Sequence, residues 1–270
     1  MSDLAAAAAF RYCRLEKDGA ILIIIIERPE VLNALNEEAH FELNRAFDLY
    51  AAATDLRVAI VTGAGERAFC VGTDLKARAL RGDYAYPPGG FGGITKRFDL
   101  WKPVIAAVNG LCLGGGLEIV AACDLAIASE HAEFALPEPR VGLAALGGGA
   151  LQRLARQMPM KEAMGLVLTA KRIAADEARR ISLINEVVPR GTARARAGDR
   201  PRHARVRAAF AGGVETGPSP ECRRARSGGS DAPPLPGRRT HAGQRGRHRG
   251  SAGVRRKAQA ALAGPLKAWA

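Results

Sequence analysis

The chain has 270 residues, 47% hydrophobic and 25% charged, which is enough for one large globular domain or two. No apolar run reaches the ~18 residues of a membrane-spanning helix, and no basic region precedes the N-terminal alanine run, so we expect neither a membrane span nor a secretory signal. Five cysteines without a C-x-x-C spacing argue against a zinc knuckle or a dense disulfide framework and favour a reducing, cytoplasmic setting.

The net charge of +13 comes from the C-terminal part of the chain. Residues 192–270 carry 18 Lys and Arg against four Asp and Glu, together with 12 Gly, 7 Pro and no Ile. A segment so poor in large aliphatic residues cannot bury enough surface to offset its chain entropy. We therefore predict a globular domain over residues 1–191 and a disordered, basic, Arg/Gly/Pro-rich tail over residues 192–270.

Strands and helices alternate in the predicted domain, which indicates the α/β class. The Ile-rich run Ala20–Glu27 is typical of a strand buried on both faces, and Asn36 can cap a helix that continues to about Ala53. Further along we predict strands over Val58–Thr62, Val104–Asn109, Leu125–Ala128, Glu133–Ala135 and Ile184–Val188, and helices over Gly115–Ala122, Met160–Thr169 and Ala174–Arg180.

The stretch GAGERA, Gly63–Ala68, has the loose form of a dinucleotide-binding fingerprint. Such a fingerprint must open a helix, whereas this one runs into Phe69 and Cys70. We interpret it as a glycine turn after a strand.

Glycines 114–116 precede a predicted helix and are followed by Leu117 and Glu118. Main-chain N–H groups at such a helix start are unobstructed and suit a developing oxyanion. The alternative is a surface glutamate that is merely favoured by the helix dipole.

Two further segments carry candidate groups. Glu138 follows a short apolar strand and a proline, where an acid or base is often presented, although an exposed loop carboxylate is the alternative. Ala68–Lys76 is expected to be a non-helical loop in which Val71 offers a main-chain N–H, or else a plain connection.

Together these segments resemble the enoyl-CoA hydratase/isomerase (crotonase) superfamily. The resemblance runs from about Leu22 to Val188 and includes ERPEVLNALN, RVAIVTGAGERAFCVGTDLKA, KPVIAAVNG, LGGGLEIVAACDLAIASEHAEFALPE and LVLTAKRIAADEA in that order. The segment PPGGFGGITKRFDLWKPVIAAVNG looks most like the carnitinyl-CoA dehydratase (crotonobetainyl-CoA hydratase) branch and its broad enoyl-CoA hydratase relatives.

The resemblance implies a spiral of ββα repeats, a C-terminal helical region, assembly as a trimer or a dimer of trimers, and an acyl-CoA substrate. By its motifs, the N–H groups of Val71 and Gly115 would form the oxyanion hole, and Glu118 and Glu138 would be the catalytic carboxylates. The CoA and adenine pocket would be lined by Gly115 and by the loop Val71, Gly72, Thr73, Asp74, Leu75 and Lys76.

The chemistry explains why these groups are needed. Hydration of a 2-enoyl thioester develops negative charge on the thioester oxygen, and each preorganised donor contributes about 3–4 kcal/mol. Two carboxyls with different pKa values can divide the proton transfers. We assign Glu138 as proton donor to C2 and Glu118 as the group that activates water. Family members that only isomerise double bonds usually keep just the glutamate matching Glu138, so the pair favours hydration. No metal or redox cofactor is expected, and coenzyme A is part of the substrate.

Four alternatives stay open. Within the family, the chain would be a carnitinyl-CoA dehydratase or an enoyl-CoA isomerase. Outside it, the chain would be an inactive scaffold, or would bind nucleic acid through the basic tail. The last is disfavoured because Phe210 and Trp269 are the tail's only aromatic residues, too few for base stacking.

The resemblance stops at Gly191. Joining the last two bases of each codon to the first base of the next lets the text from Gly191 read E-L-L-A-R-A-R-E, a typical helical continuation. The pairs Lys257-Ala258 and Gln259-Ala260 can each give only Lys or Arg, where the family has them. We therefore hypothesise a one-base insertion or a two-base loss near codon 191, and expect this version to be weakly active or inactive and its assembly to be weakened.

Overall fold

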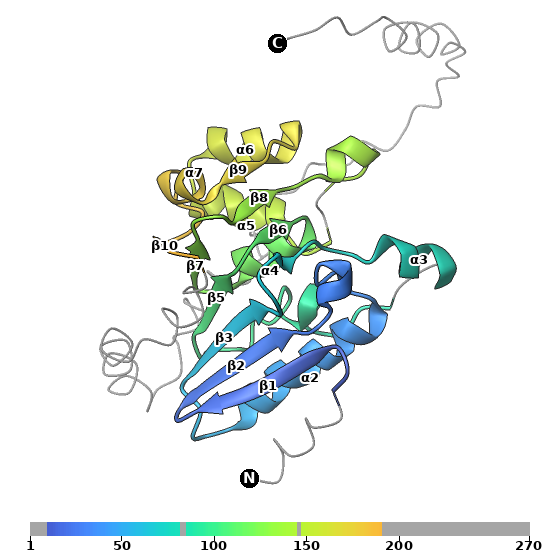
Figure 1. The fold of residues 1–270 in the computed structure, drawn as a ribbon, viewed down its shortest axis with the longest axis vertical. Helices are drawn as coiled ribbons and strands as arrows, with labels where there is room; N and C mark the ends of the chain where they lie inside the picture. Colours follow the sequence, from blue (N-terminus) through green and yellow to red (C-terminus); the bar gives the residue numbers. More distant parts are fainter. Residues whose placement is uncertain (1–9, 82–84, 145–146, 191–270) are drawn as a thin grey trace, which may run out of the picture. The chain divides into compact units, whose positions relative to one another are not determined.

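The computed structural model describes residues 10–81, 85–144 and 147–190 (Figure 1). The predicted tail of residues 192–270 lies outside these ranges, so the domain boundary stays a prediction. Within the described ranges, no helix combines the length and the apolar character that a membrane crossing requires.

A six-stranded sheet forms one layer, with strand order β1-β2-β3-β5-β7-β10. The strands β2, β3, β5, β7 and β10 run parallel, and β1 is antiparallel to β2. Their bounds are β1 (Cys13–Asp18), β2 (Ile21–Ile26), β3 (Val58–Gly63), β5 (Val104–Val108), β7 (Leu125–Ser129) and β10 (Glu186–Val188).

A second, four-stranded sheet has the order β4-β6-β8-β9. Strands β4, β6 and β8 are parallel and β9 is antiparallel to β8. Their bounds are β4 (Ala68–Cys70), β6 (Leu111–Leu113), β8 (Glu133–Ala135) and β9 (Ile173–Ala174).

The chain alternates between the two sheets and then enters a helix, three times in succession. β3 and β4 lead to α3 (Leu75–Arg81), β5 and β6 lead to α4 (Gly115–Ala122), and β7 and β8 lead through η4 (Glu138–Val141) to α5 (Ala150–Gln157). This arrangement is the spiral of ββα repeats that the sequence led us to expect, and the predicted α/β class is confirmed. The remaining elements are η2 (Pro29–Val31), α2 (Glu37–Ala52), η3 (Phe91–Gly93), α6 (Met160–Thr169) and α7 (Ala175–Arg180).

Helix α2 lies along β1 and β2, as Figure 1 shows. Its N-cap is Asn36, as predicted, whose side chain accepts a hydrogen bond from the Ala39 N–H at 3.0 Å. Leu43, Phe47 and Tyr50 are buried in the main core against the sheet.

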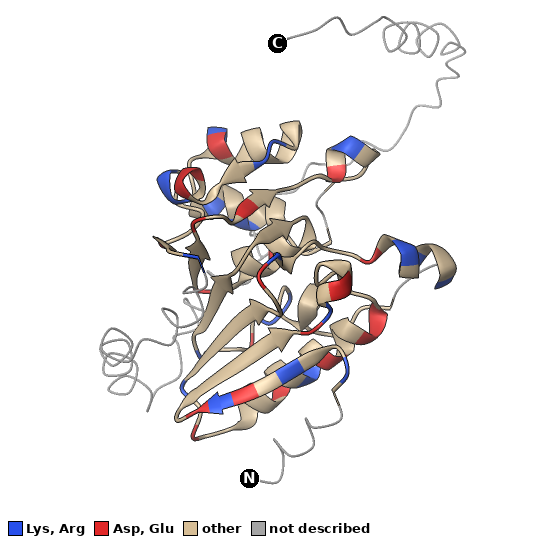
Figure 2. Cartoon of the chain, viewed as in Figure 1, with Lys and Arg blue, Asp and Glu red and all other residues tan. Residues whose placement is uncertain are grey.

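The predicted elements are all present, with ends that differ by one or two residues. The expectation of a non-helical loop over Ala68–Lys76 is wrong at both ends, because β4 and α3 occupy them. The strand β1 was also missed. Its outward face carries charges of both signs, seen as alternating blue and red along β1 in Figure 2, which suits an edge strand and masks the apolar signal.

Candidate active site

A glycine turn connects β6 to the start of α4. Gly114 has φ +53° and ψ −121°, a conformation that L side chains avoid, and a Cβ there would lie 2.8 Å from Glu138 Oε1. The Gly114 N–H donates to the Ala135 carbonyl at 2.9 Å. The turn therefore brings the helix start next to the segment that carries Glu138.

The next two glycines have no room for side chains. A Cβ on Gly115 would lie 2.2 Å from the ring of Phe91, and one on Gly116 would lie 2.0 Å from the Cys70 carbonyl oxygen. Gly115 is the first residue of α4, so its N–H has no acceptor within the helix. The structure thus presents this N–H at a closely packed turn.

The turn after β4 lies against the same helix start. Gly72 has φ +93°, and a Cβ there would lie 3.1 Å from the Gly115 nitrogen. The Gly72 N–H donates to Cys70 Sγ at 3.4 Å, and its carbonyl accepts from the Leu35 N–H at 2.8 Å. Between the described residues we find no hydrogen bond from the Val71 N–H. The structure therefore brings the predicted donors at 71 and 115 to two turns in contact.

The loop that follows is held by an ion pair. Arg28 Nη2 lies 3.0 Å from Asp74 Oδ2, with both side chains 11% exposed. Burial acts to raise the pKa of Asp74, but hydrogen bonds from the Ala77 N–H and from Arg28 outweigh it and lower that pKa. Leu75 and Lys76 begin α3 and are exposed. Val71 and Thr73 are half-buried.

Glu118 lies one turn into α4 and is 3% exposed. Its Oε1 accepts hydrogen bonds from the N–H groups of Gly148 at 2.8 Å and Ala150 at 3.3 Å. Burial raises the pKa of Glu118, while these two N–H groups and the charge of Arg153 act to lower it. The interpretation of Glu118 as a surface glutamate is therefore wrong.

Glu138 begins η4 and is half-buried. Its Oε2 is enclosed and has no hydrogen-bond partner among the residues that the structure describes. Burial, followed by the charge of Glu118, raises the pKa of Glu138. Since Glu138 lies against Gly114, which caps the helix that carries Glu118, the structure brings the two acids predicted from the sequence to the same turn.

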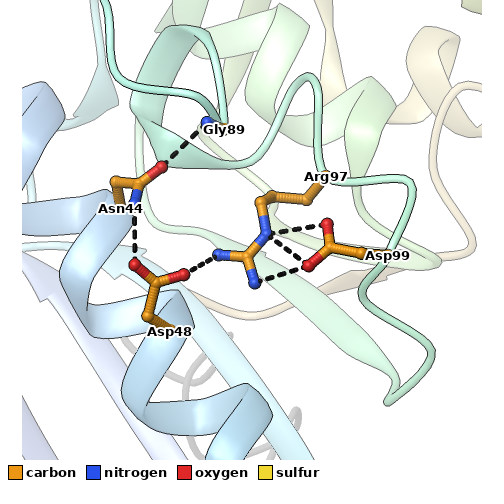
Figure 3. A network of polar contacts seen from close by, with 5 residues as sticks. All are labelled: Asn44, Asp48, Gly89, Arg97 and Asp99. Carbon is orange, nitrogen blue, oxygen red and sulfur yellow. Dashed lines mark hydrogen bonds and ion pairs between the residues drawn. The ribbon is translucent and has the colours of Figure 1, made fainter.

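A polar network holds the segment that leads to Phe91. Asn44 and Asp48 of α2 bind Gly89 and Arg97 respectively, and Arg97 also binds Asp99 (Figure 3). The Gly92 N–H donates to Nδ1 of the buried His40 at 2.9 Å. We did not predict this support for the Gly115 turn, because its contacts join residues about 50 positions apart.

A separate polar pocket lies beside the ends of β2, β3 and β5, lined by residues that include Glu27, Asn109 and His131. These side chains already have partners. Asn109 donates to the Gly63 carbonyl at 2.9 Å, His131 Nδ1 lies 2.9 Å from Ser129 Oγ, and Glu27 pairs with an arginine of β1. We therefore place the candidate active site at the glycine turn.

The chain belongs to the enoyl-CoA hydratase/isomerase family, whose model matches residues 16–203. The match ends at residue 203, beyond Gly191, the residue at which the resemblance in the motifs stops. The family and fold class predicted from the motifs are confirmed.

Individual relatives agree with this membership. A carnitinyl-CoA dehydratase from Salmonella arizonae is 45% identical over 177 residues, which are 65% of this chain and 67% of the relative. A solved carnitinyl-CoA dehydratase from Mycobacterium avium is 36% identical with a TM-score of 0.68, covering 82% of this chain and 84% of the other. A solved enoyl-CoA hydratase from Mycobacterium marinum is 35% identical with a TM-score of 0.67, covering 80% of this chain and 87% of the other.

Proposed function

We propose that this chain is a hydro-lyase that adds water across the 2,3 double bond of a 2-enoyl-CoA thioester. The observation that carries the proposal is that Glu138 lies against Gly114, at the start of the helix that carries Glu118, beside two main-chain turns in contact. The thioester oxygen binds the N–H groups of Val71 and Gly115. Both donors belong to the backbone, so the valine side chain at position 71 does not matter for this role.

The different surroundings of the two carboxyls support a division of labour. Glu118 receives two amide hydrogen bonds and the field of Arg153, which favour the carboxylate. Glu138 Oε2 is buried and unpaired, and the neighbouring charge of Glu118 favours the protonated acid.

The reaction follows from these charge states. Glu118 takes a proton from water as the oxygen attacks C3, and Glu138 gives its proton to C2. The two N–H groups hold the negative charge that develops on the thioester oxygen between these events. No oxidation state changes overall, and exchange of a proton with solvent restores both glutamates.

The loop Val71–Lys76 is proposed to contact the CoA part of the substrate. Residues 71–74 are held beside the glycine turn, while Leu75 and Lys76 are exposed at the start of α3. This arrangement supports a binding mode in which the reactive thioester lies at the buried end of the loop and the nucleotide at its exposed end.

A carnitinyl-CoA substrate is the second candidate, favoured by the 45% identical relative of that name. The two substrates differ at the end of the acyl chain, where the carnitine-type chain carries a quaternary ammonium group. Isomerisation alone is the third candidate and is disfavoured by the presence of both glutamates.

A substrate panel tests the proposal. Loss of enoyl-thioester absorbance is followed for crotonyl-CoA and crotonobetainyl-CoA, and conversion of a 3-enoyl-CoA is followed in parallel. Because the sequence predicts a shifted reading frame in the tail, the chain is compared with a version whose reading frame is restored after codon 191. We expect hydration in the restored protein, and the higher kcat/KM identifies the acyl class. Isomerisation without hydration of either enoyl thioester would contradict the proposal.

A further inference from the structure

Arg153 of α5 joins two segments that lie far apart in the sequence. Its Nη1 donates to the Gly148 carbonyl at 2.9 Å, and its Nη2 donates to the Thr95 carbonyl at 2.5 Å. The guanidinium carbon also lies 5.9 Å from the ring centroid of Phe98. Hydrogen bonds from a charged donor are stronger than neutral ones, so this side chain fixes both carbonyls.

Each of these segments leads to the candidate active site. The Gly148 N–H donates to Glu118 Oε1 at 2.8 Å, and a Cβ on Gly148 would lie 2.5 Å from Glu118 Oε2. Thr95 follows η3, whose Phe91 ring packs against Gly115. Arg153 therefore supports the acid from one side and the glycine turn from the other.

Among the charged groups around α4 that the structure describes, Arg153 is the cation whose charge acts to lower the pKa of Glu118. On the η4 side, the charge of Glu118 raises the pKa of Glu138. Two further charged groups lie nearby: Arg156 of α5, whose side chain donates to the Gln152 carbonyl, and Asp124, whose charge acts on Cys123 at the end of α4. The imidazole and the thiols on neighbouring elements stay neutral near pH 7. Burial lowers the pKa of His40 to about 4, raises that of Cys70 to about 12, and raises those of Cys112 and Cys123.

We propose that Arg153 is a positioning residue that holds Gly148 against Glu118 and keeps the Glu118 carboxyl ionised in its buried place. The structural part of this inference stands on the contacts of Arg153, and its consequence for turnover rests on the proposed hydration. Without the guanidinium, Glu118 loses a nearby positive charge, and Gly148, whose N–H donates to Glu118, loses a hydrogen bond that holds it in place. The Glu118 carboxyl therefore binds a proton more readily.

A carboxyl titration tests this inference in the chain as it exists. Infrared spectra of the wild type, Arg153→Gln and Arg153→Lys are recorded from pH 4 to 9, and the Glu118 band is identified by its loss in Glu118→Gln. In Arg153→Gln we expect Glu118 to titrate about one pH unit higher than in the wild type. Arg153→Lys keeps the charge but cannot donate to both carbonyls in the same way, so a smaller upward shift is expected.

Arg156 supplies the matched control, because it lies on the same helix and, among the described residues, its side chain donates to the Gln152 carbonyl one turn back rather than to Gly148. Arg156→Gln should leave the Glu118 titration unchanged. An unchanged titration in a folded Arg153→Gln protein, judged by circular dichroism, would overturn the inference. If Arg153→Gln does not fold, Arg153→Lys decides the matter by the same comparison.

The pH dependence of kcat/KM separates this inference from the proposed function. If hydration is measurable, its acidic limb should move to higher pH in Arg153→Gln by the amount seen in the spectra. A loss of turnover with an unmoved limb would indicate a purely structural role and overturn the inference. A shifted carboxyl band in a protein that hydrates no enoyl thioester would support the positioning role and contradict the proposed function alone.

Discussion

At the scale of single residues, the two glutamates differ mainly in what surrounds them. Glu118 is enclosed and hydrogen-bonded, whereas Glu138 has an enclosed oxygen without a partner. Buried acids without full compensation destabilise a fold when they ionise, and such groups are retained at functional sites. The stability of the protein should therefore respond to pH through these two side chains.

Glu138→Gln should stabilise the protein at pH 8 and have little effect at pH 4. The folded pKa of Glu138 lies above the ordinary value of 4.5, so the stabilising contribution of its protonated form is complete below that value and is lost as the pH rises through the folded pKa. Urea unfolding at both pH values measures the difference. Glu133→Gln, at an exposed carboxylate paired with Arg172, serves as the control. A variant less stable than the wild type at pH 8 would contradict this reasoning.

Glu118, Glu138, Val71 and Gly115 could be predicted as site residues because the motifs that carry them are contiguous. Gly148 and Arg153 were not predicted, since the hydrogen bond from Gly148 to Glu118 spans 30 positions. The glycine run at 147–149 was the available signal, because three glycines ahead of a helix often mark a close backbone approach.

At the scale of elements, buried strands and long helices were predictable and short elements were not. Five isoleucines and a leucine predicted the strand β2, and an N-cap residue with helical apolar spacing predicted α2. By contrast, β4 and β6 have three residues each, too few for a periodic pattern. The helix α3 has no buried residue and therefore lacks an apolar stripe. The close approach of α4 to β4 depends on Gly116. The spacing of apolar residues in the sequence does not predict this contact.

Gly116→Ala should separate α4 from β4 and cost about 2–3 kcal/mol of unfolding free energy, because the added Cβ would lie 2.0 Å from the Cys70 carbonyl oxygen. The matched control is Gly165→Ala in α6, where nothing lies within 4 Å of the added Cβ. There the helix should gain about 0.5–1 kcal/mol. Denaturant unfolding of both variants provides the measurement. Equal effects at the two positions would show that α4 does not depend on this contact.

At the scale of the whole molecule, the sequence predicts a disordered, basic tail over residues 192–270, which lies outside the described ranges. One observation within those ranges bears on assembly. Helix α6 exposes Met160, Met164 and Leu168, which are 56%, 41% and 65% exposed and four residues apart. Such a stripe is commonly covered by a partner surface.

Restoring the reading frame after codon 191 should therefore change both mass and activity. Light scattering after gel filtration should show a trimer or hexamer for the restored protein and a smaller species for this version. The restored protein should also hydrate enoyl thioesters faster. Equal masses and equal, robust rates would contradict the claim that the tail matters, and resequencing of the gene would test the shift itself.

The paired glutamates are the central claim, and their removal tests it most directly. Hydration of crotonyl-CoA is measured for the frame-restored protein and for its Glu118→Gln and Glu138→Gln variants, with Glu133→Gln as the control. We predict that each single variant loses about 10²–10⁴-fold in kcat, that the double variant is hardly worse than the slower single one, and that the control keeps its rate. Wild-type turnover in either Glu118→Gln or Glu138→Gln would contradict the account.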